Sequence, residues 1–142
     1  MIHFLDSSAL VKRYIDEEGS AVIGLLFRGR KVLAVSRLAE VEVPLAIARR
    51  ARRGDLRESD ARAHGEQVLR DLKTCRVVEL RTRTFERARS LGWAHGLRAY
   101  DALQLASATR LKIETGMSLT FWSADGGLNA AAAAEGLRVG LL

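Results

Sequence analysis

Short apolar runs alternate with longer amphipathic stretches along this chain. The apolar runs are typical of strands and fall at 2–5, 31–36, 76–80, 118–123 and 137–142. The stretches with helical composition fall at 9–18, 20–29, 38–53, 58–73, 84–95, 100–111 and 128–136. Strands separated by helices need crossover connections, so we predict an α/β fold with a mostly parallel central sheet of about five strands and helices on both faces. Ligands bind such sheets at the carboxyl ends of the strands.

Composition favours a single globular domain spanning residues 1–142. The chain is 48% hydrophobic, has one proline and contains no repeat or low-complexity linker. Asp6 interrupts the first apolar run, and no apolar segment approaches the length of a bilayer span, so we expect a cytoplasmic protein that does not contact membranes. The lone Cys75 excludes an internal disulfide, and three scattered histidines do not make a structural zinc site: His3, His64 and His95.

The charge balance predicts a polyanionic partner. Lys and Arg number 23 against 17 Asp and Glu, which gives a net charge of +6 and a sequence pI near 10.2. Nineteen of these 23 are Arg, whose planar fork suits phosphate and base recognition. They form two clusters: Arg49, Arg50, Arg52 and Arg53, and Arg81, Arg83, Arg87 and Arg89. For either cluster alone, a solvated helix surface is the expected interpretation.

Two of the candidate strands end at an aspartate. Asp6 follows the first strand in FLDSS, and Asp125 follows a late strand in FWSADGG. If both strands are central in a parallel sheet, the two carboxylates share one edge. Each aspartate is also well placed to cap the helix that comes next. Capping explains either one alone, whereas two such strand ends at the ligand-binding edge favour a site.

Two more acids lie in apolar surroundings. Asp101, in LRAYDALQLASA, is expected near the core at a helix N-terminus, where the helix dipole also stabilises an anion. In SRLAEVEVPLAIAR, helical periodicity favours Glu42 over Glu40 only weakly. Pro44 either kinks this segment or marks its start. Other acids lie among polar residues and are expected at the surface: Asp16, Glu17, Glu18, Asp55, Glu58, Asp60, Glu66, Asp71, Glu86 and Glu135.

A group of clustered carboxylates needs a cation. Without one, the carboxylates repel each other and one or more stays protonated. Oxygen ligands without Cys or His suit Mg²⁺ or Mn²⁺, which bind few carboxylates, keep several waters and coordinate substrate phosphate. A basic protein with an acidic Mg²⁺ pocket is the pattern expected of a nuclease, in which the metal activates a water and arginines hold the phosphate backbone.

Four segments together resemble PIN domains, and closely the VapC toxins of prokaryotic toxin–antitoxin (VapBC) pairs. They are LDSSALVK, residues 36–49, GLRAYDALQLASA and FWSADGGLNAAAAAEGL, in the family's order and spacing over essentially the whole chain. The resemblance implies a PIN-like three-layer fold and a Mg²⁺- or Mn²⁺-dependent endoribonuclease. It assigns catalysis and metal binding to four acids: Asp6, Glu42, Asp101 and Asp125. Glu42 is preferred to Glu40 because family members place this acid just before the alanine and arginine that Ala46 and Arg49 match.

The resemblance also implies supporting residues and partners. Ser8 and Ser123 match hydroxyl residues that could orient a carboxylate or a metal-bound water. The candidate RNA contacts are the first basic cluster, Arg49, Arg50, Arg52 and Arg53. The implied partners are an RNA substrate, a second copy in a homodimer, and a cognate VapB-type antitoxin that forms a heterotetramer or larger assembly and alone binds operator DNA. The chain departs from the family pattern at Pro44, Gly126 and Gly127.

Other functions are compatible with parts of the pattern. A metal-independent ribonuclease would use histidines for acid–base work, but the three in this chain occur in unrelated contexts. A receiver-like signalling domain would need an acidic pair at the first strand and a lysine after a late strand, and neither is present. A non-catalytic RNA- or protein-binding module and a non-toxin RNA-processing nuclease stay open. Core packing is expected for Trp93, Phe27 and Leu26, with a partner interface as the alternative.

Overall fold

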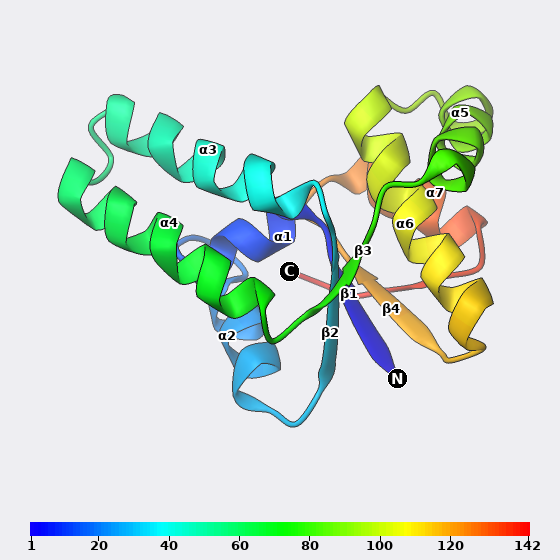
Figure 1. Ribbon diagram of the computed structural model, residues 1–142, viewed down its shortest axis with the longest axis horizontal. Coiled ribbons are helices and arrows are strands. Elements are labelled where there is room, and N and C mark those ends of the chain that lie inside the picture. The colour runs from blue at the N-terminus through cyan, green and yellow to red at the C-terminus, as the bar shows by residue number, and fades with distance from the viewer.

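A computed structural model describes residues 1–142 as a parallel sheet between two layers of helices (Figure 1). The strands are β1 (Ile2–Leu5), β2 (Val32–Ser36), β3 (Arg76–Val78), β4 (Leu119–Trp122) and β5 (Arg138–Val139). Their order across the sheet is β3-β2-β1-β4-β5, and every pairing is parallel. The predicted α/β class and five-stranded sheet are therefore confirmed.

β1 occupies the centre of the sheet. Ile2 is in register with Val32 of β2 and with Leu119 of β4. Both faces of a central parallel strand are covered, which explains why residues 2–5 are apolar apart from the partly buried His3. β1 and β4 also end in register, at Leu5 and Trp122. The residues that follow these two strands are thereby brought together at the carboxyl edge.

Helices cover both faces of the sheet. They are α1 (Ser7–Leu10), the 3₁₀ turn η1 (Val11–Arg13), α2 (Ser20–Arg28), α3 (Ala39–Arg52), α4 (Glu58–Leu72), α5 (Thr82–His95), α6 (Ala99–Thr115) and α7 (Gly126–Ala134). α1 to α4 lie on one side of the sheet and α5 to α7 on the other (Figure 1). Each layer has its own core, of 14 and 17 buried residues respectively. No helix is both long and apolar enough to cross a membrane.

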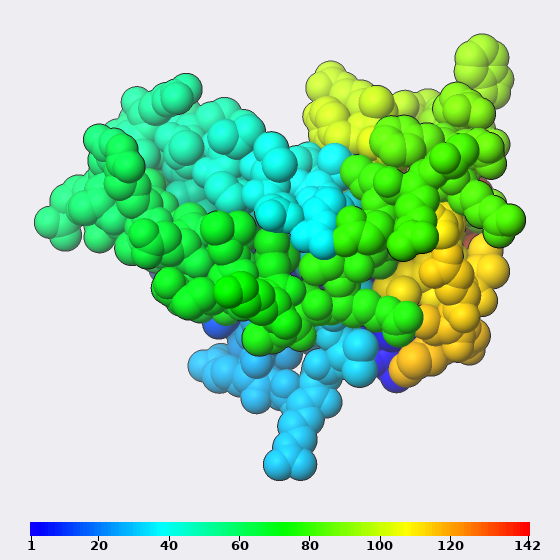
Figure 2. Space-filling view, in the orientation of Figure 1, coloured from blue at the N-terminus to red at the C-terminus, as the bar shows by residue number.

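The surface follows from this layering. α3 and α4, coloured cyan to green, form an arm that extends from the body of the molecule (Figure 2). The outline is indented between the start of α3 and the α5–α6 layer, at the carboxyl ends of the strands (Figures 1 and 2). This indentation is where a parallel sheet is expected to bind its ligand.

Several predicted boundaries differ from the structure. The helix predicted at 9–18 ends with η1 at Arg13, because local contacts compete with it. The Ser20 hydroxyl accepts a hydrogen bond from the Glu17 N–H and donates one to the Ile15 carbonyl, and Gly19 adopts a φ of 87°. Pro44 lies inside α3, which begins earlier, at Ala39, so the proline does not mark the start of the helix.

Asp71 is not the surface charge that the sequence suggested. It lies near the end of α4 and is 8% exposed. Its carboxylate accepts hydrogen bonds from Arg13 Nε, Tyr14 Oη and Gln67 Nε2 at 2.7 to 2.9 Å. A buried carboxylate with three donors is stable inside a protein because its charge is compensated there. Asp71 therefore ties α4 to the turn that follows α1.

The three large apolar residues that were expected in the core differ in their burial. Leu26 is buried, so core packing is confirmed for it. Phe27 is partly buried against the same core, with the Arg13 guanidinium 4.2 Å above its ring. Trp93, on α5, is 94% exposed, and the prediction that it packs in the core is wrong.

Candidate active site

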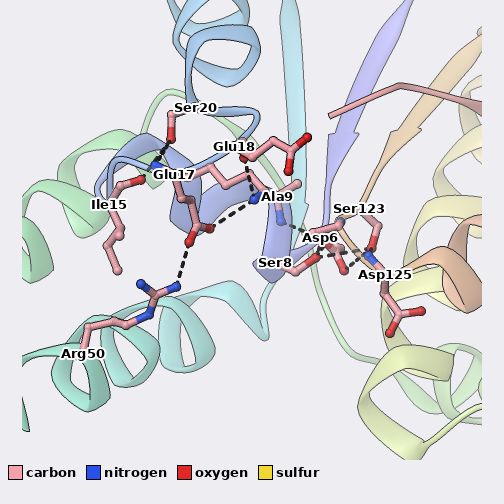
Figure 3. A network of polar contacts seen from close by, with 12 residues as sticks. Asp6, Ser8, Ala9, Ile15, Glu17, Glu18, Ser20, Arg50, Ser123 and Asp125 are labelled. Atoms are coloured by element: carbon pink, nitrogen blue, oxygen red, sulfur yellow. Dashed lines mark hydrogen bonds and ion pairs between the residues drawn. The ribbon is translucent and has the colours of Figure 1, made fainter. Parts of the chain in front are cut away.

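Asp6 stands directly at the end of β1 and begins α1. It is 4% exposed, and its Oδ1 accepts hydrogen bonds from the Ala9 N–H at 2.9 Å and the Ser8 hydroxyl at 2.7 Å. Its Oδ2 accepts a bond of 3.0 Å from the Ser123 hydroxyl (Figure 3). Burial raises the pKa of Asp6 to about 6, although these three donors oppose the shift, and the charge of Asp101 raises it further.

The end of β4 is joined to the end of β1. Ser8 and Ser123 hydroxyls lie 3.3 Å apart, and the Ala124 N–H donates to Ser8 Oγ at 2.9 Å (Figure 3). Asp125 follows at an exposed position and caps α7 by accepting a 2.8 Å bond from the Leu128 N–H. Both aspartates therefore serve as helix caps, as the capping interpretation held, and both also lie at one edge of the sheet, as the site interpretation held.

Asp101 comes to this edge from the first turn of α6. It is half-buried, and burial is the largest cause of its raised pKa, followed by the charges of Asp125 and Glu42. The nearby Arg98 opposes the shift without cancelling it. Since Asp101 in turn raises the pKa of Asp6, the four predicted acids form one electrostatically coupled group.

Glu42 joins the group from the first turn of α3. Its Oε1 accepts hydrogen bonds from Ser7 Oγ and Gln104 Nε2, each at 2.9 Å. Glu40 instead is exposed and pairs with Arg37 at 2.7 Å. The structure therefore brings Glu42, and not Glu40, to the edge of the sheet where the three aspartates lie. We call this edge, with Asp6, Glu42, Asp101 and Asp125, the acidic edge.

The acidic edge can be compared with what a divalent cation requires. No three His, Cys, Asp or Glu side chains are gathered closely enough to enclose a metal ion. The donors are nevertheless all oxygens. Burial is the main cause of the raised pKa values of Asp6 and Asp101, and neighbouring carboxylates raise both further, a repulsion that a cation would relieve. These features fit a hard ion that keeps several of its own waters, as Mg²⁺ and Mn²⁺ do.

The predicted RNA-contacting arginines separate in the structure. Arg50 turns back to Glu17 at 2.7 Å (Figure 3), and Arg53 faces Asp55 at 3.5 Å. Arg49 is exposed and has no ion-pair partner. It follows Glu42 by seven residues, close to two helical turns, and so shares its face of α3. Arg52 is exposed beside a hollow of about 620 Å³ between α3 and α4, away from the acidic edge.

Two residues around the site were missed by sequence reasoning. Ser7 lies between the predicted site residues Asp6 and Ser8 but was not itself predicted, and Gln104 was not singled out. Gln104 is 2% exposed and lies one helical turn after Asp101 in an otherwise apolar part of α6. A single amide in so apolar a stretch was a visible anomaly, since buried polar groups need partners. Which partner it finds depends on how α6 meets α1 and α3.

The fold and the acidic strand ends define a class of protein, and comparison identifies it. Residues 3–133 match the PIN domain family, and the chain belongs to that family. Two relatives from Mycobacterium tuberculosis are each 38% identical over 137 residues, which cover 96% of this chain and 92% of the relative. They are ribonuclease VapC45 of strain CDC 1551 / Oshkosh and ribonuclease VapC49 of strain ATCC 25618 / H37Rv. Within the PIN family the chain is thus of the VapC type.

Solved structures show the same fold. VapC20 of Mycobacterium tuberculosis, a sarcin-ricin loop cleaving toxin, gives a TM-score of 0.66 at 19% identity, with 91% of this chain and 94% of that chain covered. VapBC2 from Rickettsia felis, bound to a DNA fragment from its promoter, gives 0.63 at 12% identity over 99% and 98%. The PIN-like three-layer prediction is therefore confirmed.

Proposed function

We propose that this chain is a Mg²⁺- or Mn²⁺-dependent endoribonuclease that acts as the toxin of a toxin–antitoxin pair. The observation that carries the proposal is the electrostatic coupling of four acids from four separate segments at one sheet edge: Asp6, Glu42, Asp101 and Asp125. The names of the VapC relatives support ribonuclease activity. Perturbed carboxylates that share an edge at strand ends are the expected signature of a catalytic site.

The proposed chemistry is hydrolysis of a phosphodiester. The four acids would hold the ion, which when bound supplies charge neutralisation at the phosphate and lowers the pKa of a bound water. Ser8 and Ser123 fix both oxygens of Asp6, so this carboxylate keeps one orientation. A water oxygen bonds to phosphorus while the 3′-oxygen leaves and takes up a proton. The products carry a 5′-phosphate and a 3′-hydroxyl.

The proposed substrate path follows the indentation between α3 and the α5–α6 layer (Figure 2). Arg49 lies on the Glu42 face of α3, unpaired, and is the member of the basic cluster best placed to hold an RNA phosphate. Arg50 and Arg53 already bind carboxylates. Arg52 is exposed and is proposed as a second, more distant contact.

The proposed protein partner is a cognate VapB-type antitoxin. VapBC2 is a toxin–antitoxin complex with promoter DNA, and FitAcB from Neisseria gonorrhoeae has the same fold as this chain, with a TM-score of 0.64. By analogy, we infer a cytoplasmic homodimer that joins its antitoxin in a heterotetramer or larger assembly. Operator DNA would be bound through the antitoxin.

The test is RNA cleavage by the purified chain. Total, transfer and ribosomal RNA are incubated with Mg²⁺, with Mn²⁺ and with EDTA, and the new ends are mapped. Discrete cuts with 5′-phosphates are expected only with metal. Asp101→Asn and Glu42→Gln should each lower the cleavage rate about 100-fold or more, because each removes a charge from the ion's ligands.

Glu40→Gln is the matched control for Glu42→Gln. Glu40 lies on the same helix but in an exposed pair with Arg37, so cleavage should stay within about twofold of the wild type. Cleavage in EDTA that leaves cyclic phosphates would instead support a histidine mechanism. RNA binding without any cleavage would support the non-catalytic module.

A further inference from the structure

Gln104 is a buried amide with one satisfied end and one unsatisfied end. Its side chain lies in α6 at 2% exposure. The amide nitrogen Nε2 donates to Ser7 Oγ and to Glu42 Oε1, each at 2.9 Å. The amide oxygen Oε1 is buried without any hydrogen-bond donor. Buried polar atoms without a partner are rare in native proteins because they lose their hydration and gain nothing in return.

The contacts determine which way this amide faces. If the amide were rotated by 180°, its oxygen would lie 2.9 Å from a carboxylate oxygen of Glu42, and two acceptors would repel each other. With the nitrogen toward Glu42, both amide hydrogens have an acceptor, and the Ser7 hydroxyl adds a third bond by donating to Glu42 Oε1. The orphaned oxygen is the cost of this orientation.

The hydrogen bonds to Glu42 reach only one of its two carboxylate oxygens. The donors from Ser7 and Gln104 converge on Oε1 of Glu42. Oε2 makes no hydrogen bond within the protein. The carboxylate is thus held by one oxygen while the other has no partner within the protein, and an outer hydrogen-bonding partner orients a ligand in this way.

We propose that Gln104 is a positioning residue, which with Ser7 fixes Glu42 so that its second oxygen faces the reacting groups. If the side chain at position 104 only filled space, methionine would fit better, because it has a similar volume and no polar group that needs a hydrogen bond. The inference rests on the proposed function only for what the free oxygen of Glu42 contacts. The hydrogen-bond geometry stands without it.

The experiment compares Gln104→Met with Gln67→Met. Gln67 also donates to a buried carboxylate, Asp71 at 2.7 Å, but this pair lies outside the acidic edge. Gln104→Met is expected to lower Mn²⁺ affinity in calorimetry, and kcat for RNA cleavage, by about 10- to 100-fold. KM should stay within about twofold because the buried Gln104 cannot touch RNA. The unfolding midpoint in EDTA should change little, because removal of the orphaned oxygen offsets the loss of two hydrogen bonds.

The control should behave in the opposite way. Gln67→Met is expected to lower the unfolding midpoint while Mn²⁺ affinity and kcat stay at wild-type values. If Gln104→Met behaved like Gln67→Met, with lost stability and intact metal binding, Gln104 would be structural only and the inference would be overturned. If Gln104→Met failed to fold, Ser7→Ala would replace it, since Ser7 donates to the same oxygen and is only partly buried.

A double-variant cycle tests whether Gln104 acts through Glu42. The losses in Mn²⁺ affinity for Gln104→Met and Glu42→Gln should not add when combined, because the second removes the group on which the first acts. Fully additive losses would overturn the inference. If the wild type bound Mn²⁺ but cleaved no RNA, the proposed function would fail, while the calorimetric cycle would still decide the role of Gln104.

Discussion

Asp6 combines two roles in one side chain. Its Oδ1 caps α1 through the Ala9 N–H, and its Oδ2 is bound by Ser123 from the neighbouring strand end. Capping and ligand binding are often weighed as alternatives for an acid at this position. Here the cap fixes the carboxylate at the edge where we propose that the ion binds, so capping and the proposed ligand role are compatible in one group.

Stability should depend on pH through Asp6. Its pKa of about 6 in the folded protein lies above its ordinary value of 3.8, so the folded state holds the proton more tightly than the unfolded chain does. Stability from this group is therefore greatest below pH 4 and is lost as the pH rises towards and beyond 6, by about 3 kcal/mol in all. Asp6→Asn should remove this loss.

The measurement is urea unfolding in EDTA at pH 4, 5, 6 and 7. The free energy of unfolding of Asp6→Asn, relative to the wild type, should increase across this range. A difference that stays constant would contradict the prediction, since the substitution would then have removed no titration. Metal is left out because a bound cation would favour the ionised carboxylate and hide the effect.

For single residues, the sequence predicted the acids better than it predicted the residues Ser7 and Gln104 that hold Glu42 in place. Asp6 and Asp125 stand at strand ends in an α/β pattern, and this position is visible along the chain. Periodicity separated Glu42 from Glu40 only weakly, because Glu40 also has apolar neighbours at helical spacing and Pro44 complicates the helical count. The roles of Ser7 and Gln104 depend on contacts 35 to 97 residues apart in sequence, which no local pattern contains.

The helix α3 links the acidic edge to the basic end of the arm. Glu42 lies in its first turn, and the arginine cluster fills its last turns, which complements the helix dipole at both ends. Ordinary helix-end charge could explain the cluster by itself. The geometry distinguishes its members, because only those on the Glu42 face can reach a substrate that lies at the edge.

Arg49→Ala should weaken RNA binding more than Arg53→Ala. The first removes an unpaired guanidinium on the Glu42 face, and the second removes one that already faces Asp55. For Arg49→Ala, Kd in fluorescence anisotropy should rise severalfold at about 0.1 M salt, and the slope of log Kd against log salt should fall by about 1. Equal effects of the two substitutions would argue that the cluster acts only through overall charge.

Element boundaries were predictable where periodicity was long and failed where side chains compete with the backbone. α3 and α4 fall within a residue of their predicted limits at both ends. The helix predicted at 9–18 ends early because Ser20 and Gly19 build a turn that composition alone does not reveal. The exposure of Trp93 likewise could not be read from its apolar character, since residue type predicts burial only on average.

At the scale of the whole molecule, two cores stand on opposite faces of one thin sheet. The arm made by α3 and α4 belongs to one of them. Its base is held by Asp71, through the Arg13 guanidinium, the Tyr14 hydroxyl and the Gln67 amide. Burial opposes ionisation of Asp71, but these three donors outweigh it and hold its pKa below the ordinary value.

Asp71→Asn should destabilise the fold without altering the chemistry. In the variant, the amide NH₂ group faces hydrogen-bond donors, and the charge of Arg13 is no longer compensated. The free energy of unfolding in urea at pH 7 should therefore fall by about 2 to 4 kcal/mol. The loss should shrink at acid pH, where the wild-type carboxylate also becomes neutral. Where the variant is folded, RNA cleavage should match the wild type; slower cleavage would mean that the arm and the acidic edge are coupled.

The central position of β1 would make the proposed activity depend on the order of folding. Asp6 and Ser123, which meet at the edge, are 117 positions apart in the chain. Contacts of such long range form late and slowly, because the entropy cost of closing a large loop comes before the contacts stabilise the chain. An intermediate with β2 and β3 already beside β1, but β4 undocked, would leave Asp6 without its neighbouring strand end. Under the proposed function, topology alone would then keep the enzyme inactive until its assembly is almost complete.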